Sequence, residues 1–483
     1  MANLPELLTA IEREACKASL FEFVKSFWGV IIPETPVFNW HIPYLCEELE
    51  KLSYYIVNRL EKPYDLLINI PPGTTKSTLV TIFWPVWLWT QDPTIRTITN
   101  TYSEDLSVEF ATKSRDIIQS DKFRRLFPEI KLRRDKSGKQ SYENTKTGAR
   151  YTTSTGGTIT GKHAHLIISD DPQNPKQAES DTLRKTANDH TKTLSSRKVD
   201  KRNTPTVTIM QRLHENDVTG YILSRGKENV RHICLPAEAS GMVKPAELKE
   251  KYIDGLLDPV RLSRAVLDEA RLDLGSRAYS GQYEQNPIPD GGNIVKKEWF
   301  PRISRAEFER IRGYEPYIFF ADTAYTSDRS NDPTGIIATC KIENKIYIVN
   351  GKKLWLDFPD LCRFIVRWTA ENGYNNESSI RIEPKASGLS TVQTLQRTTG
   401  LNITITDTPR DDKKTRLSAA SPTIECGRVV LVDDFFTEEF VEEVCGFPAK
   451  EHDEYVDILA YAVDYYNNVE EESEPQDLDD FFN

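Results

Sequence analysis

The sequence predicts an α/β protein built from two domains, and three observations carry this prediction. The chain has 483 residues, enough for two domains that each bury a core. In the first half, short apolar runs end in polar residues and alternate with helical sequence, as in a mostly parallel sheet covered by helices. In the second half, two apolar runs end in carboxylates. We expect a first domain over 1–240, a linker region over 241–295, a second domain over 296–468 and an acidic disordered tail over 469–483.

The first element that carries chemistry is a strand, a turn and a helix. Residues 64–70 (YDLLINI) read as a short buried strand, and helical sequence begins at Ser77. The stretch NIPPGTTKSTLV at 69–80 nearly matches the phosphate-binding pattern G-x-x-x-x-G-K-[ST]. Backbone N–H groups of such a turn and the following helix N-terminus point at phosphate oxygens. We expect Lys76 to add a positive charge and Ser77 to offer its hydroxyl to Mg²⁺.

This phosphate loop, residues 71–77, departs from the pattern, because Ile70 and Thr75 stand where the pattern has glycines. A β-branched residue tolerates a positive φ poorly, so Thr75 weakens the prediction. The alternative is a Pro-Gly turn ahead of a buried helix. If nucleotide binds here, the residues that contact it are Gly73, Thr74, Thr75, Lys76, Ser77 and Thr78.

A second apolar run, LIISDD at 166–171, ends in two adjacent carboxylates. ATPases place such acids beside the phosphate loop. Asp170 would hold Mg²⁺, and Asp171 would position the attacking water as a general base. The alternative is a strand that ends in an ordinary turn, because Asp-Asp-Pro also suits a loop. The strand-like sequence at 94–99 between this run and Lys76 favours the ATPase.

Two further segments lie on either side of these acids. The glycine-rich turn at 154–162 lines a substrate path or simply connects two strands. The strand at 206–210 ends in Gln211, which is placed to sense a terminal phosphate because strand ends face the ligand crevice in such sheets. For Gln211 and for Arg212, which would stabilise phosphate charge, an ordinary loop role is an equal alternative. His214 is better explained as a turn residue.

The second half places three carboxylates on predicted elements. Strand 316–322 ends in Asp322, with a hairpin partner at 336–340, and strand 379–383 ends in Glu383. Asp457 lies on a helix at 453–464, next to its buried apolar stripe. Carboxylates beside a buried face are costly unless they bind cations or hydrogen-bond donors.

Asp322, Glu383 and Asp457 together are suited to two Mg²⁺ or Mn²⁺ ions about 3.5–4 Å apart, which would activate water and stabilise the leaving oxygen of a phosphodiester. Three unrelated surface acids are the open alternative. Asp453 and Asp332 are candidates for outer ligands. The candidates for contact with DNA phosphate, each with a solvated surface role as the alternative, are Lys385, Lys413 and Arg416.

Composition sets the remaining limits. The net charge is −11, but much of it lies in the terminal stretch 470–480, so the folded part is closer to neutral. The seven cysteines have no C-x-x-C spacing, which predicts reduced thiols and no zinc site. The most apolar window, 79–89, is too short to span a bilayer and contains Pro85, so we expect a buried, kinked helix there and no membrane partner.

Taken in order, these motifs resemble those of the large terminase subunits of tailed bacteriophages, which package DNA with an ATPase and cut it with a nuclease. The resemblance extends from about Phe38 to Tyr465. It runs through PPGTTKS (71–77), GGTITG (156–161), LIISDDP (166–172), QRLHEND (211–217), LPA (235–237), QYEQNPIPDGG (282–292), DTA (322–324), IEPKASG (382–388) and HDEYVD (452–457).

The resemblance implies a P-loop ATPase motor of the additional-strand, catalytic-glutamate type, followed by an RNase H-like nuclease domain. Asp171 stands where many relatives have glutamate. Trp40 and His41 resemble the segment that contacts adenine, with aromatic packing at a helix start as the alternative for Trp40. An arginine finger is expected without assignment, and its candidates are Arg115, Arg150 and Arg212.

The resemblance also implies cofactors and partners. It implies ATP and Mg²⁺, with Mn²⁺ possible in place of Mg²⁺ at the nuclease carboxylates, and catalytic roles for Lys76, Asp171, Asp322, Glu383 and Asp457. It implies double-stranded DNA, a portal protein and a small terminase subunit as partners of a homo-oligomeric ring in the host cell cytoplasm. Two rival functions remain: a nuclease with a silent nucleotide domain, and a helicase-like translocase that does not cut.

Overall fold

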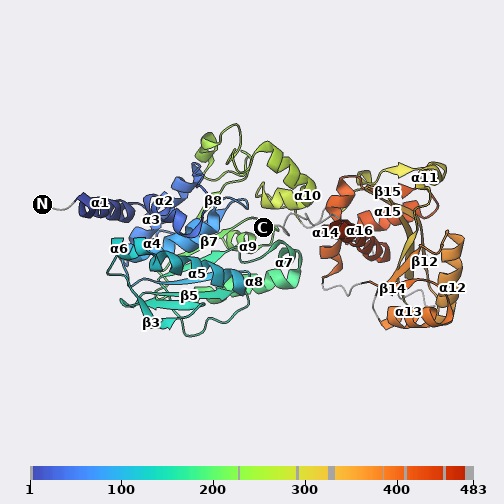
Figure 1. The fold of residues 1–483 in the computed structure, drawn as a ribbon, viewed down its shortest axis with the longest axis horizontal. Coiled ribbons are helices and arrows are strands. Elements are labelled where there is room, and N and C mark those ends of the chain that lie inside the picture. The colour runs from blue at the N-terminus through green and yellow to red at the C-terminus, as the bar shows by residue number, and fades with distance from the viewer. Residues whose placement is uncertain are drawn as a thin grey trace, which may run out of the picture. The chain divides into compact units, whose positions relative to one another are not determined.

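The computed structural model describes residues 4–226, 229–289, 293–324, 332–383, 386–406, 411–449 and 453–473. They fall into two compact units: the first is Met1–Arg271 with Arg277–Asp290, and the second is Leu272–Ser276 with Gly291–Asn483 (Figure 1). Both are mixed α/β, as expected. Among the described residues, no helix is long and apolar enough to cross a membrane. All seven cysteines are free.

The first unit contains an eight-stranded sheet in the order β3-β4-β5-β2-β6-β7-β1-β8. From β5 to β8 all neighbours pair in parallel, and only β3 and β4 are antiparallel. The mostly parallel sheet is therefore confirmed. Its strands are β1 Asp65–Asn69, β2 Arg96–Thr101, β3 Leu132–Ser137, β4 Ser141–Asn144, β5 Ala149–Ser154, β6 Leu166–Asp170, β7 Thr206–Met210 and β8 Val230–Cys234.

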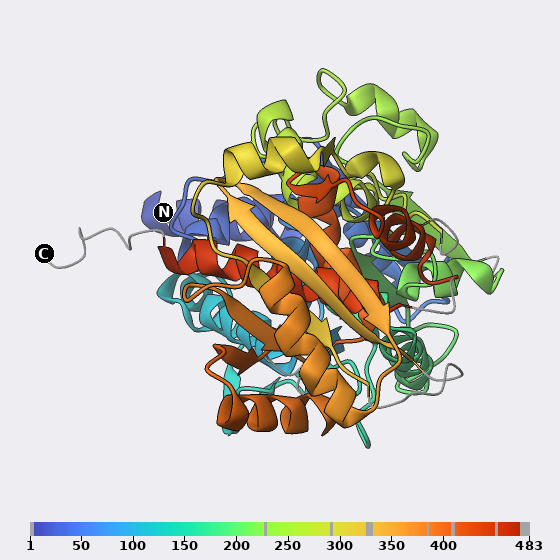
Figure 2. The ribbon, with the colours of Figure 1, turned by 90° about the vertical axis from the view of Figure 1, so that its right-hand side faces the viewer.

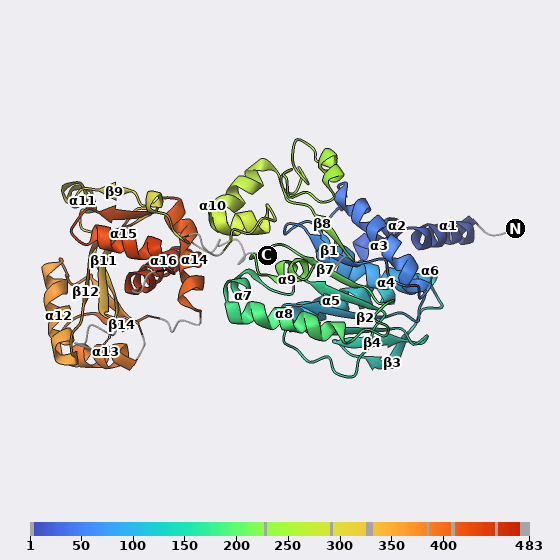
Figure 3. The same cartoon turned by 180° about the vertical axis from the view of Figure 1, so that it is seen from behind.

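Helices surround this sheet, and several begin with a side-chain cap. Ser103, for example, accepts a hydrogen bond from the Leu106 N–H at 3.2 Å and starts α5, which packs against β2 and β5 (Figure 3). The helices are α1 Leu4–Ala18, α2 Leu20–Ile31, α3 His41–Val57, η1 Thr78–Phe83, α4 Trp84–Gln91, α5 Glu104–Gln119, α6 Asp121–Leu126, α7 Pro175–Glu179, α8 Asp181–Ser195, α9 Val218–Ser224, η2 Ala246–Lys251 and α10 Arg264–Gln282.

The apolar window after the phosphate loop is buried and irregular, as its proline predicts. It begins as the π-helix η1, and the Trp84 N–H donates to the Leu79 carbonyl five residues earlier. Pro85, which has no N–H to continue this pattern, lies in the first turn of α4. The change of helix type takes place between Phe83 and Trp84, directly before Pro85.

Most of the region expected as a linker belongs to the first unit instead. The Asn39 side chain donates to the Leu257 carbonyl at 2.7 Å. The Ala237 N–H donates to the Tyr283 carbonyl at 2.7 Å. These contacts, between residues far apart in sequence, attach the segment to the body of the first unit, and a reading of local composition could not detect them.

The second unit contains a seven-stranded sheet in the order β14-β13-β10-β11-β12-β15-β9. The two long strands β11 and β12 run side by side in it (Figure 2). β10, β11 and β12 are antiparallel neighbours, while β13 and β14 run parallel to β10 on its other side. This is the predicted RNase H-like arrangement, extended by β15 and β9. The strands are β9 Arg302–Ile303, β10 Ile318–Asp322, β11 Thr334–Ile342, β12 Lys345–Leu354, β13 Ser379–Ile382, β14 Ile403–Ile405 and β15 Val429–Val432.

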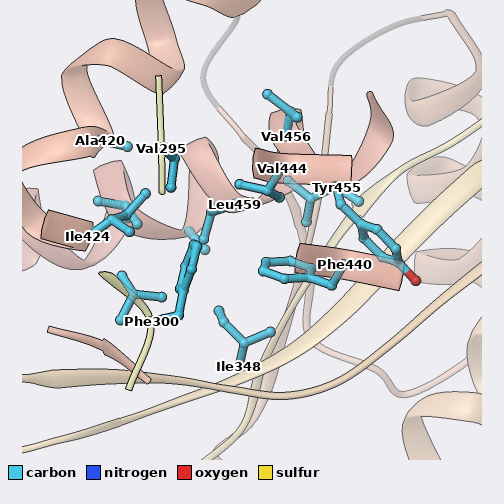
Figure 4. Close-up of a cluster of buried hydrophobic side chains, with 14 of the residues drawn as sticks. Val295, Phe300, Ile348, Ala420, Ile424, Phe440, Val444, Tyr455, Val456 and Leu459 are labelled. Atoms are coloured by element: carbon cyan, nitrogen blue, oxygen red, sulfur yellow. The ribbon is translucent and has the colours of Figure 1, made fainter. Parts of the chain in front are cut away.

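Alternate residues of β10 point to opposite faces of this sheet and enter two different cores. Phe319 and Ala321 pack in the core that includes α12, and Phe320 packs in the core formed with α14, α15 and α16 (Figure 4). The helices are η3 Lys297–Trp299, α11 Arg305–Arg312, α12 Phe358–Glu371, α13 Ala386–Thr398, α14 Lys413–Glu425, α15 Thr437–Gly446 and α16 Glu454–Ser473.

Two candidate active sites

In the first unit, the sheet brings the phosphate loop and the paired acids to one edge. β1 leads into the loop and β6 ends in Asp170, with β7 inserted between them. Asn69 lies opposite Met210, and Asp170 lies opposite Ile209, so all three strands end side by side. This edge is where open α/β sheets bind ligands. The inserted β7 is the additional strand that the resemblance implies.

The phosphate loop adopts the conformation that its sequence seemed to oppose. Gly73 has a φ of 74° and Thr75 a φ of 68°. A non-glycine residue held at such a φ costs on the order of 1–3 kcal/mol, and such strain clusters at ligand sites. The Thr74 hydroxyl donates to the Pro71 carbonyl at 2.7 Å, and His41 Nε2 lies 3.2 Å from the Thr74 carbonyl oxygen. Thr75 therefore adopts the positive φ that the pattern assigns to glycine, at a cost in strain, and surrounding contacts hold the turn.

Asp170 is the centre of a buried polar cluster. Ser77 Oγ donates to Asp170 Oδ1 at 2.9 Å, and Thr81 Oγ1 donates to Asp170 Oδ2 at 2.5 Å. Burial raises the pKa of Asp170 to about 7, and the neighbouring Asp171 charge adds to this increase. A divalent cation would relieve that cost, and one hydroxyl with one carboxylate is an oxygen donor set suited to Mg²⁺.

Asp171 faces the lysine of the phosphate loop. Lys76 Nζ lies 2.8 Å from Asp171 Oδ2, and the Gln211 N–H donates to Asp171 Oδ1 at 3.2 Å. Asp171 has a φ of 40°, a second strained position at this edge. Its backbone is fixed by bonds from Tyr102 N–H to its carbonyl and from its own N–H to the Ile209 carbonyl. Lys76 and Asp171 therefore meet directly, from opposite sides of the inserted strand.

The remaining predicted nucleotide contacts lie near this pair. Thr78 starts η1 directly after Ser77, and Gly73 is exposed in the loop. Gln211 follows β7, and its buried Oε1 has no hydrogen-bond partner in the described parts of the chain. Its amide therefore has hydrogen-bonding capacity left for a ligand at this edge.

All three arginine-finger candidates make contacts within the first unit, and Arg115 Nη1 donates to the Gly138 carbonyl at 3.5 Å. Arg150 is fully buried on β5 and donates to Ser114 Oγ. Arg212 pairs with the buried Asp217 at 2.9 Å and donates to the His214 carbonyl, so it stabilises the turn at 212–217. Arg115 is half-buried on α5.

The segment expected at adenine lies beside the phosphate loop. Burial lowers the pKa of His41 to about 4, so its ring is neutral at pH 7. The Trp40 ring lies 5.6 Å from the Tyr252 ring and 6.3 Å from the Tyr44 ring, measured between centroids. Aromatic packing, the alternative weighed for Trp40, is thus present.

In the second unit, the predicted carboxylates follow neighbouring strands. Asp322 ends β10 and Glu383 directly follows β13; their neighbours Ala321 and Ile382 pair in parallel. The Glu383 N–H donates to the Ala321 carbonyl at 3.1 Å. Both acids are therefore at the same edge of the sheet and nearly buried.

Asp457 lies on α16 and is connected to Glu383 by a network of side chains. The sequence did not predict this network. The Tyr461 hydroxyl donates to Glu383 Oε1 at 2.6 Å, and Arg416 bonds both to Tyr461 and to Asp457 Oδ1, the latter at 2.5 Å. Lys413 Nζ lies 2.8 Å from Asp457 Oδ2 and also pairs with Asp453. Burial raises the pKa of Asp457, and the Glu383 charge adds to this effect.

The contacts of Asp457 with Lys413 and Arg416 bear on whether the second site can hold metal ions. The donors are carboxylate oxygens, which suit Mg²⁺ and Mn²⁺. Within the described ranges, however, no three His, Cys, Asp or Glu side chains are grouped closely enough to hold an ion. Lys413 and Arg416 neutralise Asp457, which offsets the cost of its burial in the way a metal would. Asp332 is exposed ahead of β11, and Lys385 lies outside the described residues.

Three residues at these sites were not predicted from the sequence. Thr81 and Tyr461 follow Ser77 and Asp457 by four positions on their helices, so helical spacing was an available signal. Arg261 donates to Thr75 Oγ1 across 186 positions, and no local pattern marks it.

No protein-family model and no curated protein matches the chain. Among solved structures, it is similar to the large terminase of the thermophilic bacteriophage D6E in complex with ADP, with 12% identity, a TM-score of 0.48, and coverage of 86% of this chain and 98% of that one. The nuclease domain of the bacteriophage SPP1 large terminase with bound Mn matches at 13% identity and a TM-score of 0.27, with coverage of 36% of this chain and 99% of that one. The human cytomegalovirus terminase nuclease domain matches at 14% identity and a TM-score of 0.28, with coverage of 36% of this chain and 96% of that one.

Proposed function

We propose that the protein is a viral DNA packaging motor that hydrolyses ATP to move double-stranded DNA into a procapsid and cuts concatemeric DNA with a metal-dependent endonuclease. The observation that carries the ATPase half is the cluster in which Ser77 and Thr81 bind Asp170 while Lys76 meets Asp171. Packaging rests on the order of the motifs. The portal protein, the small terminase subunit, the ring and the host cytoplasm are parts of the same proposal.

In the ATPase half, Lys76 exchanges Asp171 for the phosphates of ATP, and the phosphate loop N–H groups surround them. Ser77 and Asp170 would hold Mg²⁺, whose charge would offset negative charge that develops on the phosphates. Asp171, released from Lys76, accepts a proton from the attacking water as general base. Gln211 senses the terminal phosphate through its side-chain amide.

In the nuclease half, Asp322, Glu383 and Asp457 would hold the metal ions once these side chains draw together, and the ions would supply activated water and stabilise the leaving oxygen. Asp457 exchanges Lys413 and Arg416 for metal. Lys413 and Arg416 would then bind DNA phosphates, to which lysine and arginine donate charge-assisted hydrogen bonds.

The test of the ATPase half is steady-state hydrolysis by the purified full chain with Mg²⁺, with and without linear double-stranded DNA. We expect turnover in the wild type and none in Lys76→Ala. Absence of wild-type turnover even with DNA and added portal protein contradicts the motor and favours the nuclease with a silent nucleotide domain.

The test of the nuclease half is cleavage of plasmid DNA with Mg²⁺ or Mn²⁺. We expect Asp322→Ala to lose cleavage while it retains ATP hydrolysis. Equal cleavage by Asp322→Ala and the wild type would favour a translocase that does not cut.

A further inference from the structure

Arg261 contacts the phosphate loop from a segment far away in the sequence. Its Nη1 donates to the hydroxyl of Thr75, the residue directly before Lys76. Thr75 stands where the phosphate-binding pattern has glycine, so a glycine there would offer Arg261 no side chain. The unusual residue of the loop and the distant arginine are therefore partners.

The position of Arg261 is fixed by a buried acid. Asp258 is fully buried, and its Oδ1 accepts the backbone N–H groups of Val260 and Arg261, each at 3.2 Å. The preceding residue, Leu257, accepts a hydrogen bond from Asn39, two residues before the His41 that contacts the loop. The backbone that carries Arg261 is therefore hydrogen-bonded to the segment before α3, and that segment also contacts the phosphate loop.

The charge of Arg261 has no counter-ion in the described parts of the chain, where the Thr75 hydroxyl is its hydrogen-bond partner. Lys76, by contrast, already pairs with Asp171 at 2.8 Å. A guanidinium has five N–H donors, and a hydroxyl accepts only one of them here. Arg261 is half-buried. A half-buried cation beside a loop whose backbone is arranged for anions points to an anionic ligand.

We propose that Arg261 binds the polyphosphate of a nucleoside triphosphate at this loop, exchanging the Thr75 hydroxyl for phosphate oxygens. The proposal rests on the proposed ATP binding and names a cation within the same chain that acts beside Lys76. The planar guanidinium suits phosphate because it offers two parallel N–H donors. Thr75 holds this side chain at the loop until nucleotide binds.

The test measures the dissociation constant of ATPγS with Mg²⁺, together with kcat and KM for ATP, in the full chain. We expect Arg261→Ala to weaken ATPγS binding at least tenfold, and Arg261→Lys to lie between that variant and the wild type because a lysine keeps the charge but not the paired donors. Arg264→Ala is the matched control, since Arg264 contacts Glu238 and the Asp254 carbonyl, and it should bind like the wild type.

Thr75→Val separates phosphate contact from a merely structural role. If Arg261 only shapes the loop through Thr75, the two variants Thr75→Val and Arg261→Ala lose the same affinity. Under our proposal, the loss in Arg261→Ala exceeds that in Thr75→Val at least fivefold, because the Thr75 contact is given up when phosphate binds.

Two results would overturn the inference alone: ATPγS affinity of Arg261→Ala within threefold of wild type, or equal losses in Arg261→Ala and Thr75→Val. A wild-type chain that binds no ATPγS would instead overturn the proposed nucleotide site together with this inference. Should Arg261→Ala fail to fold, Arg261→Lys and Thr75→Val still decide, because tighter or equal binding by Arg261→Lys relative to wild type contradicts paired donation.

Discussion

At the scale of single residues, the two acids after β6 have different tasks because they have different neighbours. Asp170 is buried among hydroxyls, whereas Asp171 is more accessible and faces Lys76. The order of the two aspartates after the strand led to the same assignment, but it did not show the neighbours that distinguish them. The assignment of Asp170 to metal and Asp171 to water remains a prediction, and these contacts support it.

Asp171→Asn should separate binding from hydrolysis. The asparagine can still accept the Gln211 N–H, but it removes the general base and the negative partner of Lys76. We expect kcat to fall at least about 100-fold, within the range of general-base effects. ATPγS should bind at least as tightly as in the wild type, because Lys76 has no competing carboxylate. A kcat within tenfold of wild type, measured by phosphate release, would assign the base elsewhere.

A second single-residue prediction concerns pH and the second unit. Glu454 is nearly buried, and burial, together with the nearby Glu443 charge, raises its pKa from 4.5 to about 7. As the pH rises above 4.5, the unfolded chain releases this proton before the folded chain does. Stability therefore falls between about pH 4.5 and pH 7 and then stays level.

Glu454→Gln should remove that loss. We expect the variant to be more stable than the wild type at pH 8 by on the order of 1–3 kcal/mol, and the difference to shrink towards pH 5. Urea unfolding of the full chain at both pH values measures it. A difference that is the same at pH 5 and pH 8 would show that Glu454 does not titrate in this interval.

At the scale of elements, local patterns located several strands but not their order. The apolar runs at β1, β6, β7 and β10 are short and end in polar residues, so their positions followed from composition. The pair β3 and β4 was not predicted, because sequences such as LRRDKS lack an apolar alternation. The insertion of β7 between β1 and β6 depends on long-range pairing and was available only through the resemblance.

The contact between α14 and α16 shows the same limit. Lys413 and Arg416 were candidates for contact with DNA phosphate or for a solvated surface, and their spacing gave no sign that both bond to Asp457. Burial of Asp457 without a partner would be costly, so the fold places cations from a neighbouring helix against it. Asp457 needs a positively charged partner only once α14 and α16 pack against each other, so local sequence does not show it.

Lys413→Met should tighten metal binding at the second site. The substitution removes a cation that lies 2.8 Å from Asp457 and leaves the carboxylates to Mn²⁺. We expect at least threefold tighter Mn²⁺ binding by isothermal titration of the full chain, together with weaker DNA binding. Lys345→Met, at an exposed position of β12, is the matched control and should match wild type. Unchanged or weaker Mn²⁺ binding in Lys413→Met would mean that the metal does not compete for Asp457.

At the scale of the whole molecule, each unit has its own sheet, core and candidate site. The two-domain organisation was predictable from length, because one core rarely grows to this size. The boundary was placed differently by the structure, since residues 241–271 bond to the first unit. Composition marks charged, helical sequence there but not what it packs against.

We therefore expect two thermal transitions in the full chain, each sensitive to one ligand. Mg²⁺ with ATPγS should raise the first unit's transition and Mn²⁺ the second's; a ligand at 100 times its dissociation constant adds about 2.7 kcal/mol. Lys76→Ala should abolish only the first shift and Asp322→Ala only the second. Calorimetry that finds one transition shifted by both ligands would contradict independent sites.

The contact between Thr75 and Arg261 has a consequence for how such chains diverge. A threonine before the loop lysine is useful only while an arginine reaches it from 186 positions away, and a glycine there would leave the arginine without its neutral partner. The two positions should therefore change together among homologous chains. In an alignment of homologous chains, threonine at the first position should accompany arginine at the second more often than chance allows.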